Sequence, residues 1–307
     1  MGTAAAQAGA CKGLTEHRGV TVIVVAYGPA RALDDALRAL QGRFPVIVVD
    51  NGSSAQAREV AGEAGATYVD PGRNLGFAGG VNLALAHRTA PDDDVLLLNP
   101  DARITPADLE RLRDALHADP ALACVAPGLV DPVSAEASRA HWPWHTPGAS
   151  WAEAVGLARR RLDSGRYFLS GAVLLISGAA LADVGPFDER FFLYNEEEDF
   201  QRRALARRWR VRLCPDVTAF HRQGGTDRDP ERHRARLHAA IERYVRKWYG
   251  PAGWALYRSG MVAGQGVRSL VRHGPARHNA TRLLWLYLRG PDRVARRTGA
   301  VPDPASR

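Results

Sequence analysis

The chain has 307 residues, of which 46% are hydrophobic and 24% are charged, an ordinary composition for a folded protein of one large domain or two small ones. This composition excludes a wholly disordered chain, and the lack of a run of about 18 apolar residues argues against a membrane-spanning helix. The net charge of +8 lies entirely in residues 251–307, which carry ten Arg, no Lys and two Asp, so a polyanionic partner is expected for that region.

Strands and helices alternate from residue 20 to about residue 127. Continuous apolar runs predict strands at 20–27, 46–49, 67–69 and 95–98, and the spacing of leucines predicts a helix over 31–41. Three further helices are expected. One follows a cap at Ser53 or Ser54, one follows the glycine-rich segment 72–80 and ends near residue 87, and one begins at Pro106 with Thr105 as its cap. This order predicts a mostly parallel α/β sheet with helices on both faces, whose ligands bind at the carboxyl ends of the strands.

The second half of the chain is less regular. Residues 131–161 are expected to form a long loop with a short helix near 151–161, followed by one strand over 167–177. An acidic helix is expected from 195 to about 208, then short strands at 210–213 and 217–220 and a helix over 232–249. Pro251, Gly253 and Gly264 are expected to break the helical pattern before further basic helices. We therefore expect a flexible N-terminus (1–18), an α/β domain (19–249) and a basic helical extension (250–307) with a disordered end.

Polar residues follow the predicted strands directly, at Tyr27, Asp50, Asp70 and Asp101. Asp50 begins the run Asp-Asn-Gly-Ser, where a carboxylate can accept the N3–H of a pyrimidine base, although an ordinary loop explains the run equally well. Asp101 ends the run Asn-Pro-Asp, where one carboxylate can hold Mg²⁺ or Mn²⁺ together with substrate phosphates. Taken alone, that run is more often a turn cap than a metal site.

The glycine-rich run 74–82 enters a helix, and helix N-termini attract phosphate. It does not have the Gly-x-Gly-x-x-Gly spacing and does not follow the first strand, which disfavours a dinucleotide-dependent oxidoreductase. We expect these glycines to allow close packing of the backbone near a ligand or against the sheet.

Four consecutive acids, residues 196–199, open the next helix of interest. They suit the positive end of a helix dipole, which is a purely structural explanation. The apolar run 191–194 before them favours partial burial instead, a setting that raises a carboxyl pKa and suits a general base. His221 follows the last predicted strand, where it is a candidate metal ligand or an ordinary structural histidine, and Arg222 beside it can meet a phosphate.

Seven segments in order make the sequence similar to the family 2 glycosyltransferases with a GT-A fold, in particular their rhamnosyltransferase-like branch. The segments are VDNGS (49–53), NLGFAGGVN (74–82), LLNPDA (97–102), SGA (170–172), GPFDE (185–189), FFLYNEE (191–197) and HRQGGT (221–226). The resemblance covers residues 20–226 and implies a sugar transfer with inversion, from a nucleoside diphosphate to an acceptor hydroxyl.

The resemblance also implies roles for individual residues. Asp50 would bind the nucleobase, and Asp101 with His221 would hold Mg²⁺ or Mn²⁺ beside the diphosphate. Glu197 falls where the family has an aspartate base, and this departure leaves Glu196 and Asp199 as further candidates. Asn99 stands where many relatives have aspartate, which makes metal dependence less certain than transfer. The residues expected to bind the donor are Tyr27, Asp50, Asn51, Asn74, Gly76, Gly79, Asn82, Asn99 and Gly171.

The branch favours a dTDP-sugar such as dTDP-L-rhamnose, with a UDP-sugar as the alternative, and a polysaccharide or polyprenyl-linked saccharide as acceptor. A small natural product as acceptor and a non-catalytic nucleotide-sugar-binding protein are the rival hypotheses. Binding of nucleic acid is not expected, because residues 1–250 are neutral overall and lack a recognisable binding motif.

The basic extension combines Arg with Trp254, Tyr257, Trp285 and Tyr287, which suits peripheral contact with an anionic membrane as well as a packed basic helical pair. The first residues lack the charged start and apolar core of a secretory signal. Three cysteines, at 11, 124 and 214, have no disulfide or metal-binding spacing, and the last two are expected to be buried. A cytoplasmic location is therefore predicted, with contact at the inner face of the cell membrane.

Overall fold

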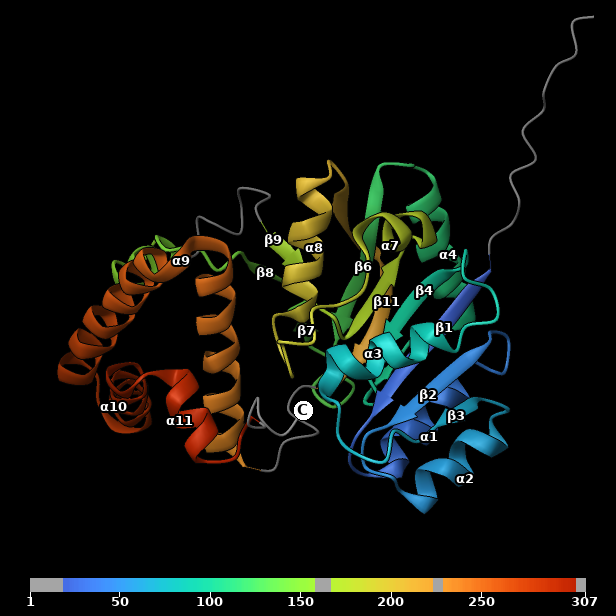
Figure 1. Ribbon diagram of the computed structural model, residues 1–307, viewed down its shortest axis with the longest axis horizontal. Helices are drawn as coiled ribbons and strands as arrows, with labels where there is room; N and C mark the ends of the chain where they lie inside the picture. The colour runs from blue at the N-terminus through green and yellow to red at the C-terminus, as the bar shows by residue number, and fades with distance from the viewer. Residues whose placement is uncertain (1–18, 158–166, 223–228, 302–307) are drawn as a thin grey trace, which may run out of the picture.

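The computed structural model describes residues 19–157, 167–222 and 229–301 (Figure 1). An α/β unit and a lobe of C-terminal helices lie side by side. Both chain ends expected to be disordered, and residues 223–226 of the last matching segment, lie outside the described residues.

One large sheet forms the centre of the α/β unit, with the strand order β3-β2-β1-β4-β10-β6-β11-β5 and β7 paired with β6. The first strands are β1 (Val20–Ala26), β2 (Val46–Asp50), β3 (Thr67–Val69), β4 (Asp94–Leu98) and β5 (Ala102–Arg103). The later strands are β6 (Leu122–Val130), β7 (Ala137–Ser138), β10 (Val173–Ile176) and β11 (Arg210–His221). The first four strands run parallel to one another, as predicted, whereas β10 runs antiparallel to both of its neighbours, β4 and β6.

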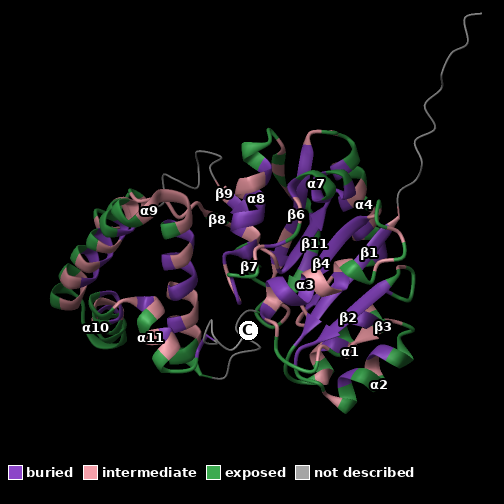
Figure 2. Cartoon of the chain, in the orientation of Figure 1, coloured by how far each residue is buried: buried purple, intermediate pink, exposed green. Residues whose placement is uncertain are grey.

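Helices cover both faces of this sheet. They are α1 (Ala30–Ala39), α2 (Ala55–Glu63), α3 (Gly76–Ala86), α4 (Pro106–His117), α7 (Gly178–Val184) and α8 (Glu196–Ala206). Every residue of β1 is buried, because alternate side chains enter two different cores. Val22 and Val24 pack with α1, α2 and α4, whereas Ile23 and Val25 pack with α3, α7 and α8. The central strands β1, β2, β4 and β10 therefore appear buried along their full length in Figure 2, whereas β3 and much of β11 are not.

Both predicted helix caps are present. The Ser54 side chain accepts a hydrogen bond from the Ala57 N–H, and Thr105 accepts one from Asp108 with Pro106 in the first turn. The two buried cysteines also agree with expectation, because Cys124 and Cys214 are free thiols inside the cores.

Two predicted boundaries in the second half are wrong. The run 167–177 is not one strand: β9 (Tyr167–Leu169) pairs with β8 (His141–Pro143) in a separate small sheet, and only β10 joins the main sheet. The intervening turn contains Gly171. Conversely, the two short strands expected at 210–213 and 217–220 are a single strand, β11, whose pairing with β6 shifts register between Cys214 and Thr218.

The C-terminal helices are α9 (Pro230–Val271), α10 (Gly274–Arg289) and α11 (Pro291–Arg297). The expected end of a helix at 249 is confirmed, because Gly250 is non-helical (φ 67°) and divides α9 into two helices at a kink, with Pro251 directly after it. The further breaks expected at Gly253 and Gly264 are wrong, since the second half of α9 continues to Val271. The expected domain boundary at 249/250 falls on this kink. Gly264 serves packing instead, as does Gly260, since a Cβ at Gly264 would lie 2.9 Å from Ala154 Cβ and one at Gly260 would lie 2.4 Å from Ser150 Oγ, both on α5 (Ala149–Ala154).

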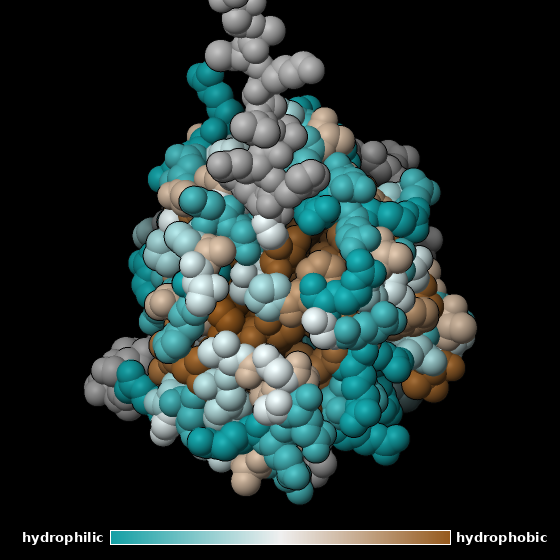
Figure 3. Space-filling model, turned by 90° about the vertical axis from the view of Figure 1, so that its right-hand side faces the viewer, coloured by the Kyte–Doolittle hydropathy of each residue, from teal (hydrophilic) through white to brown (hydrophobic). Residues whose placement is uncertain are grey.

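The helical lobe is joined to the α/β unit by two adjacent aromatic side chains. Phe191 lies in a core with Tyr244 and Tyr287, and Phe192 in a second core with Ala239 of α9. These phenylalanines directly precede α8, so the lobe fixes the position of the acidic helix. In the described part of the chain, no helix is long and apolar enough to cross a bilayer. The face of the α/β unit that points away from the helical lobe is mainly hydrophilic around a hydrophobic recess (Figure 3).

The fold leaves no room for a side chain at Gly76. Its φ is +76°, and a Cβ there would lie 2.2 Å from the Phe192 carbonyl oxygen. Adding the cost of a left-handed residue to that of an overpacked contact, we expect Gly76→Ala to lower the free energy of unfolding by about 3 kcal/mol or more. Gly72→Ala is the control, because Gly72 also has a positive φ (+68°) but open space around it, and it should cost only about 1 kcal/mol. Equal losses in denaturant titrations would show that the contact with Phe192 relaxes without cost.

Candidate functional site

Asp50 lies at the carboxyl end of β2 and is 2% exposed. Its Oδ1 accepts a hydrogen bond from the Gly52 N–H at 2.9 Å, and its Oδ2 accepts from the Ser54 N–H at 2.7 Å and from the Tyr68 hydroxyl at 2.9 Å. Burial and this carboxylate raise the pKa of Tyr68 to about 12, so the hydroxyl remains a donor. Each carboxylate oxygen has two lone pairs, so Oδ1 keeps one acceptor site for an N–H of a ligand.

Tyr27 follows β1 and lies beside this carboxylate. Its side chain is 55% exposed, and its Cδ2 atom is 3.9 Å from the point where a Cβ of Gly52 would lie. An exposed aromatic face next to a buried acceptor is an arrangement that suits a planar heterocyclic base. Asp70, another of the carboxylates that follow the predicted strands, instead accepts hydrogen bonds from the Ser53 hydroxyl and the Gly72 N–H. These bonds hold the loop in place and lower the pKa of Asp70.

Two of the asparagines expected to bind the donor hold the backbone in place. The Asn51 amide donates to the Gly76 carbonyl at 2.9 Å and accepts from the Leu75 N–H at 3.1 Å. Asn74 accepts from the Gly76 N–H at 2.9 Å. The loop that leads into α3 is therefore tied to the end of β2.

Helix α3 lies directly on the sheet and on the segment before α8. A Cβ at Gly80 would be 2.7 Å from Val25 Cγ1, and one at Gly79 would be 3.0 Å from Leu75 Cβ. Asn82 bonds the N–H and the carbonyl of Phe187, both at 2.9 Å, and also bonds Glu189. The expected close packing of these glycines is present, and the Asn82 side chain is occupied by the protein.

Asp101 and His221 come together although 120 positions separate them. Strand β5 pairs with the end of β11, and the distance from Asp101 Oδ1 to His221 Nε2 is 3.3 Å. Asn99 lies two positions before Asp101, and its N–H donates to the Ala172 carbonyl of the neighbouring turn. In residues 19–157, 167–222 and 229–301 no group of three His, Cys, Asp or Glu side chains is close enough to hold a metal by itself. A carboxylate and an imidazole fit Mn²⁺ or Mg²⁺ only if a ligand supplies further oxygens.

The entry to α8 is strained. Tyr194 and Asn195 both have left-handed backbones, with φ of 73° and 65°. Such residues cost on the order of 1–3 kcal/mol each and persist where the surroundings fix them, which is common at functional sites. Tyr194 is held by a hydrogen bond between its hydroxyl and His233, at 3.0 Å.

Glu196 and Glu197 follow this strained turn, and each has a buried Oε2 atom without a hydrogen-bond partner among the described residues. Burial, with the neighbouring charge of Glu197, raises the pKa of Glu196 well above its usual value. Burial raises the pKa of Glu197 to about 7, against hydrogen bonds from backbone N–H groups that include that of Gly171. Adjacent carboxyls with different environments can divide the acid and base roles between them.

Asp199, the third candidate base, has its carboxylate enclosed. It is fully buried and bonds Arg203 at 3.0 Å, Lys247 at 2.5 Å and the Trp248 indole N–H at 2.9 Å. These contacts belong to a structural ion-pair network between α8 and α9. We therefore assign Asp199 to packing and retain Glu196 and Glu197 as the candidates for the base.

Glu198 has an anchoring role that the sequence did not reveal. Its buried carboxylate accepts hydrogen bonds from the His145 N–H, the His145 Nδ1 and the Asn195 amide. It thereby joins the long loop before α5 to the cap of α8. No local pattern around His145 indicates this contact, because the two residues are 53 positions apart in the sequence.

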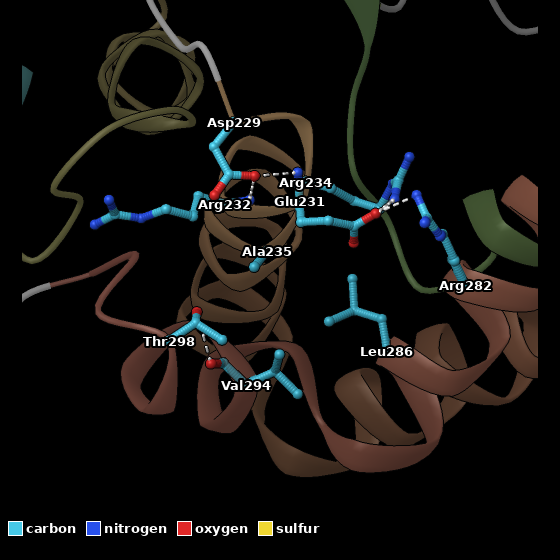
Figure 4. Close-up of a pocket in the computed structure, with 9 residues that line it drawn as sticks. All are labelled: Asp229, Glu231, Arg232, Arg234, Ala235, Arg282, Leu286, Val294 and Thr298. Carbon is cyan, nitrogen blue, oxygen red and sulfur yellow. Dashed lines mark hydrogen bonds and ion pairs between the residues drawn. The ribbon is translucent and has the colours of Figure 1, made fainter.

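Two cavities of about 270 and 300 Å³ lie in the helical lobe and not at the carboxyl edge of the sheet. The first is bounded by the start of α9 and by α10 and α11, with Arg234 and Arg282 paired with Glu231, while Arg232 points away from them (Figure 4). The second lies between Arg190 and Arg246, beside Phe191. Neither is lined by a residue predicted for catalysis, donor binding or metal binding.

Comparison with known proteins gives consistent results. A model of the family described as glycosyl transferase family 2 matches residues 21–175. The chain is 27% identical to an N-acetylglucosaminyl-diphospho-decaprenol L-rhamnosyltransferase of Mycobacterium tuberculosis, covering 76% of this chain and 88% of that protein.

Two solved structures have a similar fold. One is a mannosyltransferase of Pyrobaculum calidifontis in complex with GDP-mannose and Mn²⁺ (TM-score 0.55, 16% identity, 93% of this chain and 85% of that one). The other is glucosyl-3-phosphoglycerate synthase of M. tuberculosis with Mn²⁺, UDP and phosphoglyceric acid (TM-score 0.56, 17% identity, 76% and 80%). Their different nucleotides show that this fold alone does not determine the base.

Proposed function

Since the chain belongs to glycosyl transferase family 2, and is a nucleotide-sugar-dependent glycosyltransferase with the GT-A fold, we propose that it transfers its sugar with inversion and that Glu197 is the base. The observation that carries this proposal is the unpartnered, buried Oε2 of Glu197, on a carboxyl whose pKa is about 7. Near neutral pH such a carboxylate is able both to accept a proton and to exist in the charged form.

Glu197 would remove the proton from the acceptor hydroxyl as the oxygen attacks the anomeric carbon from the side opposite the leaving diphosphate. Glu196 is the more buried of the pair, and burial with the neighbouring charge of Glu197 raises its pKa well above the usual value, so it would remain protonated. Gly171 supports this geometry, because its N–H bonds Glu197 and a Cβ there would lie 3.5 Å from the Glu197 Cβ. The turn that interrupts the predicted strand 167–177 thus positions the base.

The donor nucleotide would bind along the carboxyl ends of β1 and β2. The remaining acceptor site on Asp50 Oδ1 suits the N3–H of uracil or thymine, and the exposed ring of Tyr27 suits stacking on the base. Asn74, Gly76, Gly79 and Asn82 would shape the neighbouring loop and helix, as their backbone contacts indicate.

Asp101 and His221 would hold a divalent ion, Mg²⁺ or Mn²⁺, next to Asn99. Such an ion, when bound, would neutralise charge on the departing diphosphate. Two side chains are too few for a permanent metal site, which is consistent with an ion that arrives with the diphosphate and completes its coordination from phosphate and water oxygens.

For the finer identity, the proposal is a deoxyhexose such as L-rhamnose, carried by dTDP or UDP, and a saccharide acceptor linked to a polyprenyl lipid or belonging to a polysaccharide. Its support is the similarity to the N-acetylglucosaminyl-diphospho-decaprenol L-rhamnosyltransferase over most of both chains. We also propose a cytoplasmic enzyme that contacts the inner face of the cell membrane through its basic C-terminal region, where such an acceptor would be met.

A thermal-shift series with dTDP- and UDP-sugars, with and without Mn²⁺, tests the donor site. A donor at about 100 times its dissociation constant should stabilise the protein by about 2.7 kcal/mol. We expect one nucleotide class to produce the shift, with Mn²⁺ enlarging it. Folded protein that shows no shift with any donor would contradict the donor site and favour a non-catalytic role.

A further inference from the structure

Seven of the fourteen large hydrophobic side chains that are exposed in the described part of the chain lie on two neighbouring elements. Leu256, Val267, Leu270 and Val271 belong to α9 after its kink and are between 50% and 78% exposed. Trp151, Val155 and Leu157 belong to α5 and the turn after it, and are between 40% and 64% exposed. Monomeric proteins rarely gather exposed apolar side chains in this way without an interaction that uses them.

The α9 residues form a stripe. Positions 256, 263, 267 and 270 are spaced by 7, 4 and 3 residues, which places them on one face of a helix, and all four are exposed. The opposite face, with Trp254, Tyr257 and Met261, is buried in the core of the lobe. This half of α9 therefore carries apolar side chains on two opposite faces, one packed in the core of the lobe and one exposed.

Helix α5 lies alongside the stripe and extends it. The Trp151 indole N–H donates to the Leu256 carbonyl at 3.1 Å and to Ser259 Oγ at 3.3 Å. Further along, Gly264 packs against Ala154, and Arg268 bonds Glu153. The two helices thus present their exposed apolar side chains as one surface, which we call the α5–α9 surface.

The charge around the α5–α9 surface has one sign. Residues 243–291 contain nine Arg or Lys and no Asp or Glu. Glu153 on α5 is already paired with Arg268. Beyond Leu270 the chain is exposed from 271 to 279, and this tip carries Arg272 and Arg277.

From this combination we propose that the α5–α9 surface docks on an anionic lipid bilayer, with the stripe in the interface and the basic tip against the headgroups. Apolar and tryptophan side chains beside arginine are the chemistry by which helices lie in a membrane interface. A second copy of this chain fits less well, because it would bring two acid-free basic segments together. The inference deepens the proposed lipid-linked acceptor, but its test involves no turnover, so the two can fail separately.

The test is sedimentation of the full chain with vesicles of phosphatidylcholine alone or with about a third phosphatidylglycerol. The wild type should bind the anionic vesicles and scarcely bind the neutral ones. Val267→Asp combined with Leu270→Asp should weaken binding by about tenfold or more, because it removes apolar contact and adds two negative charges at the headgroups. Both side chains are mostly exposed, so folding should be retained. Val133→Asp is the matched control, being 77% exposed on the loop after β6, and should bind as the wild type does.

Arg272→Gln combined with Arg277→Gln should weaken binding to the anionic vesicles and leave the slight binding to neutral ones unchanged. The proposal is overturned if the wild type binds neither vesicle, or if the Val267→Asp, Leu270→Asp variant binds as well as the wild type. It is also overturned if sedimentation equilibrium shows a dimer that this variant dissociates, since the surface would then serve a second copy.

Discussion

Replacing Glu197 by Gln should lower turnover by about 10²–10⁴-fold and leave donor affinity nearly unchanged. Glutamine keeps the size of the side chain and can keep its hydrogen bond from Gly171, but it cannot accept a proton. Initial rates at saturating donor, with donor affinity from calorimetry, measure the two quantities. Glu196→Gln is the matched control on the neighbouring position, and it should cost much less, because Glu196 is proposed to be already protonated.

The pH dependence of turnover is a second test of Glu197 as the base. Because the base acts in its deprotonated form and the pKa of Glu197 is about 7, wild-type turnover should rise with pH up to about 7 and level off above it. The remaining turnover of Glu197→Gln should lack this rise. Wild-type rates in the variant, or an unchanged pH profile, would reject Glu197 as the base.

Stability should change in the opposite direction to activity in this variant. The pKa of Glu197 is higher in the folded protein than its ordinary value of 4.5, so the folded state binds more protons in between and wild-type stability falls as the pH rises from about 4.5 to 7. A neutral Gln does not titrate, so the variant should melt no lower than the wild type at pH 8. That result would show that the lost turnover is not lost folding.

The first half of the fold could be predicted from the sequence because its local signals and its tertiary packing agree. The runs that form β1, β2 and β4 are apolar at successive positions, since helices cover both faces of the sheet. Ser54 and Thr105 cap their helices by accepting a hydrogen bond from the backbone N–H three positions later. These signals need no knowledge of distant residues.

The errors in the second half arise where distant residues decide. The apolar run 167–177 looks continuous, but its two halves pair with different strands, β8 and β4. Gly264 looks like a helix breaker, yet in α9 it makes room for α5, which precedes it by about 110 residues. In both cases a partner remote in sequence overrides the local preference.

The candidate site shows the same division. The residue types and their order indicated which residues to consider, and Asp101 and His221 do meet once β5 pairs with β11. The sequence could not show which polar side chains are already occupied. Asn51, Asn82 and Asp199 are bound by the protein itself, whereas Glu196 and Glu197 retain an oxygen without a partner among the described residues. That difference depends on packing.

Replacing Asp101 by Asn should abolish the strengthening of nucleotide binding by Mn²⁺ and lower turnover by about 10²-fold or more. The change removes a charge but little volume, and the Asp101 carbonyl, which accepts the Arg222 N–H, is untouched. His221 alone is a single neutral ligand, which is too weak to retain the ion beside a diphosphate. Calorimetric titration of dTDP or UDP, with Mn²⁺ and with a chelator, measures the effect.

Asp216→Asn is the control for this variant. Asp216 is exposed on β11, five positions before His221 of the same strand, and its substitution removes the same charge. It should keep both the Mn²⁺ effect and the turnover, because any change there acts only through the long-range field, which salt screens. If Asp101→Asn keeps the full Mn²⁺ effect, the ion is held elsewhere and the pairing of Asp101 with His221 is structural. If instead Mn²⁺ has no effect on the wild type, the enzyme stabilises the leaving diphosphate without a metal, and Arg222, whose N–H bonds the Asp101 carbonyl, becomes the residue to substitute next.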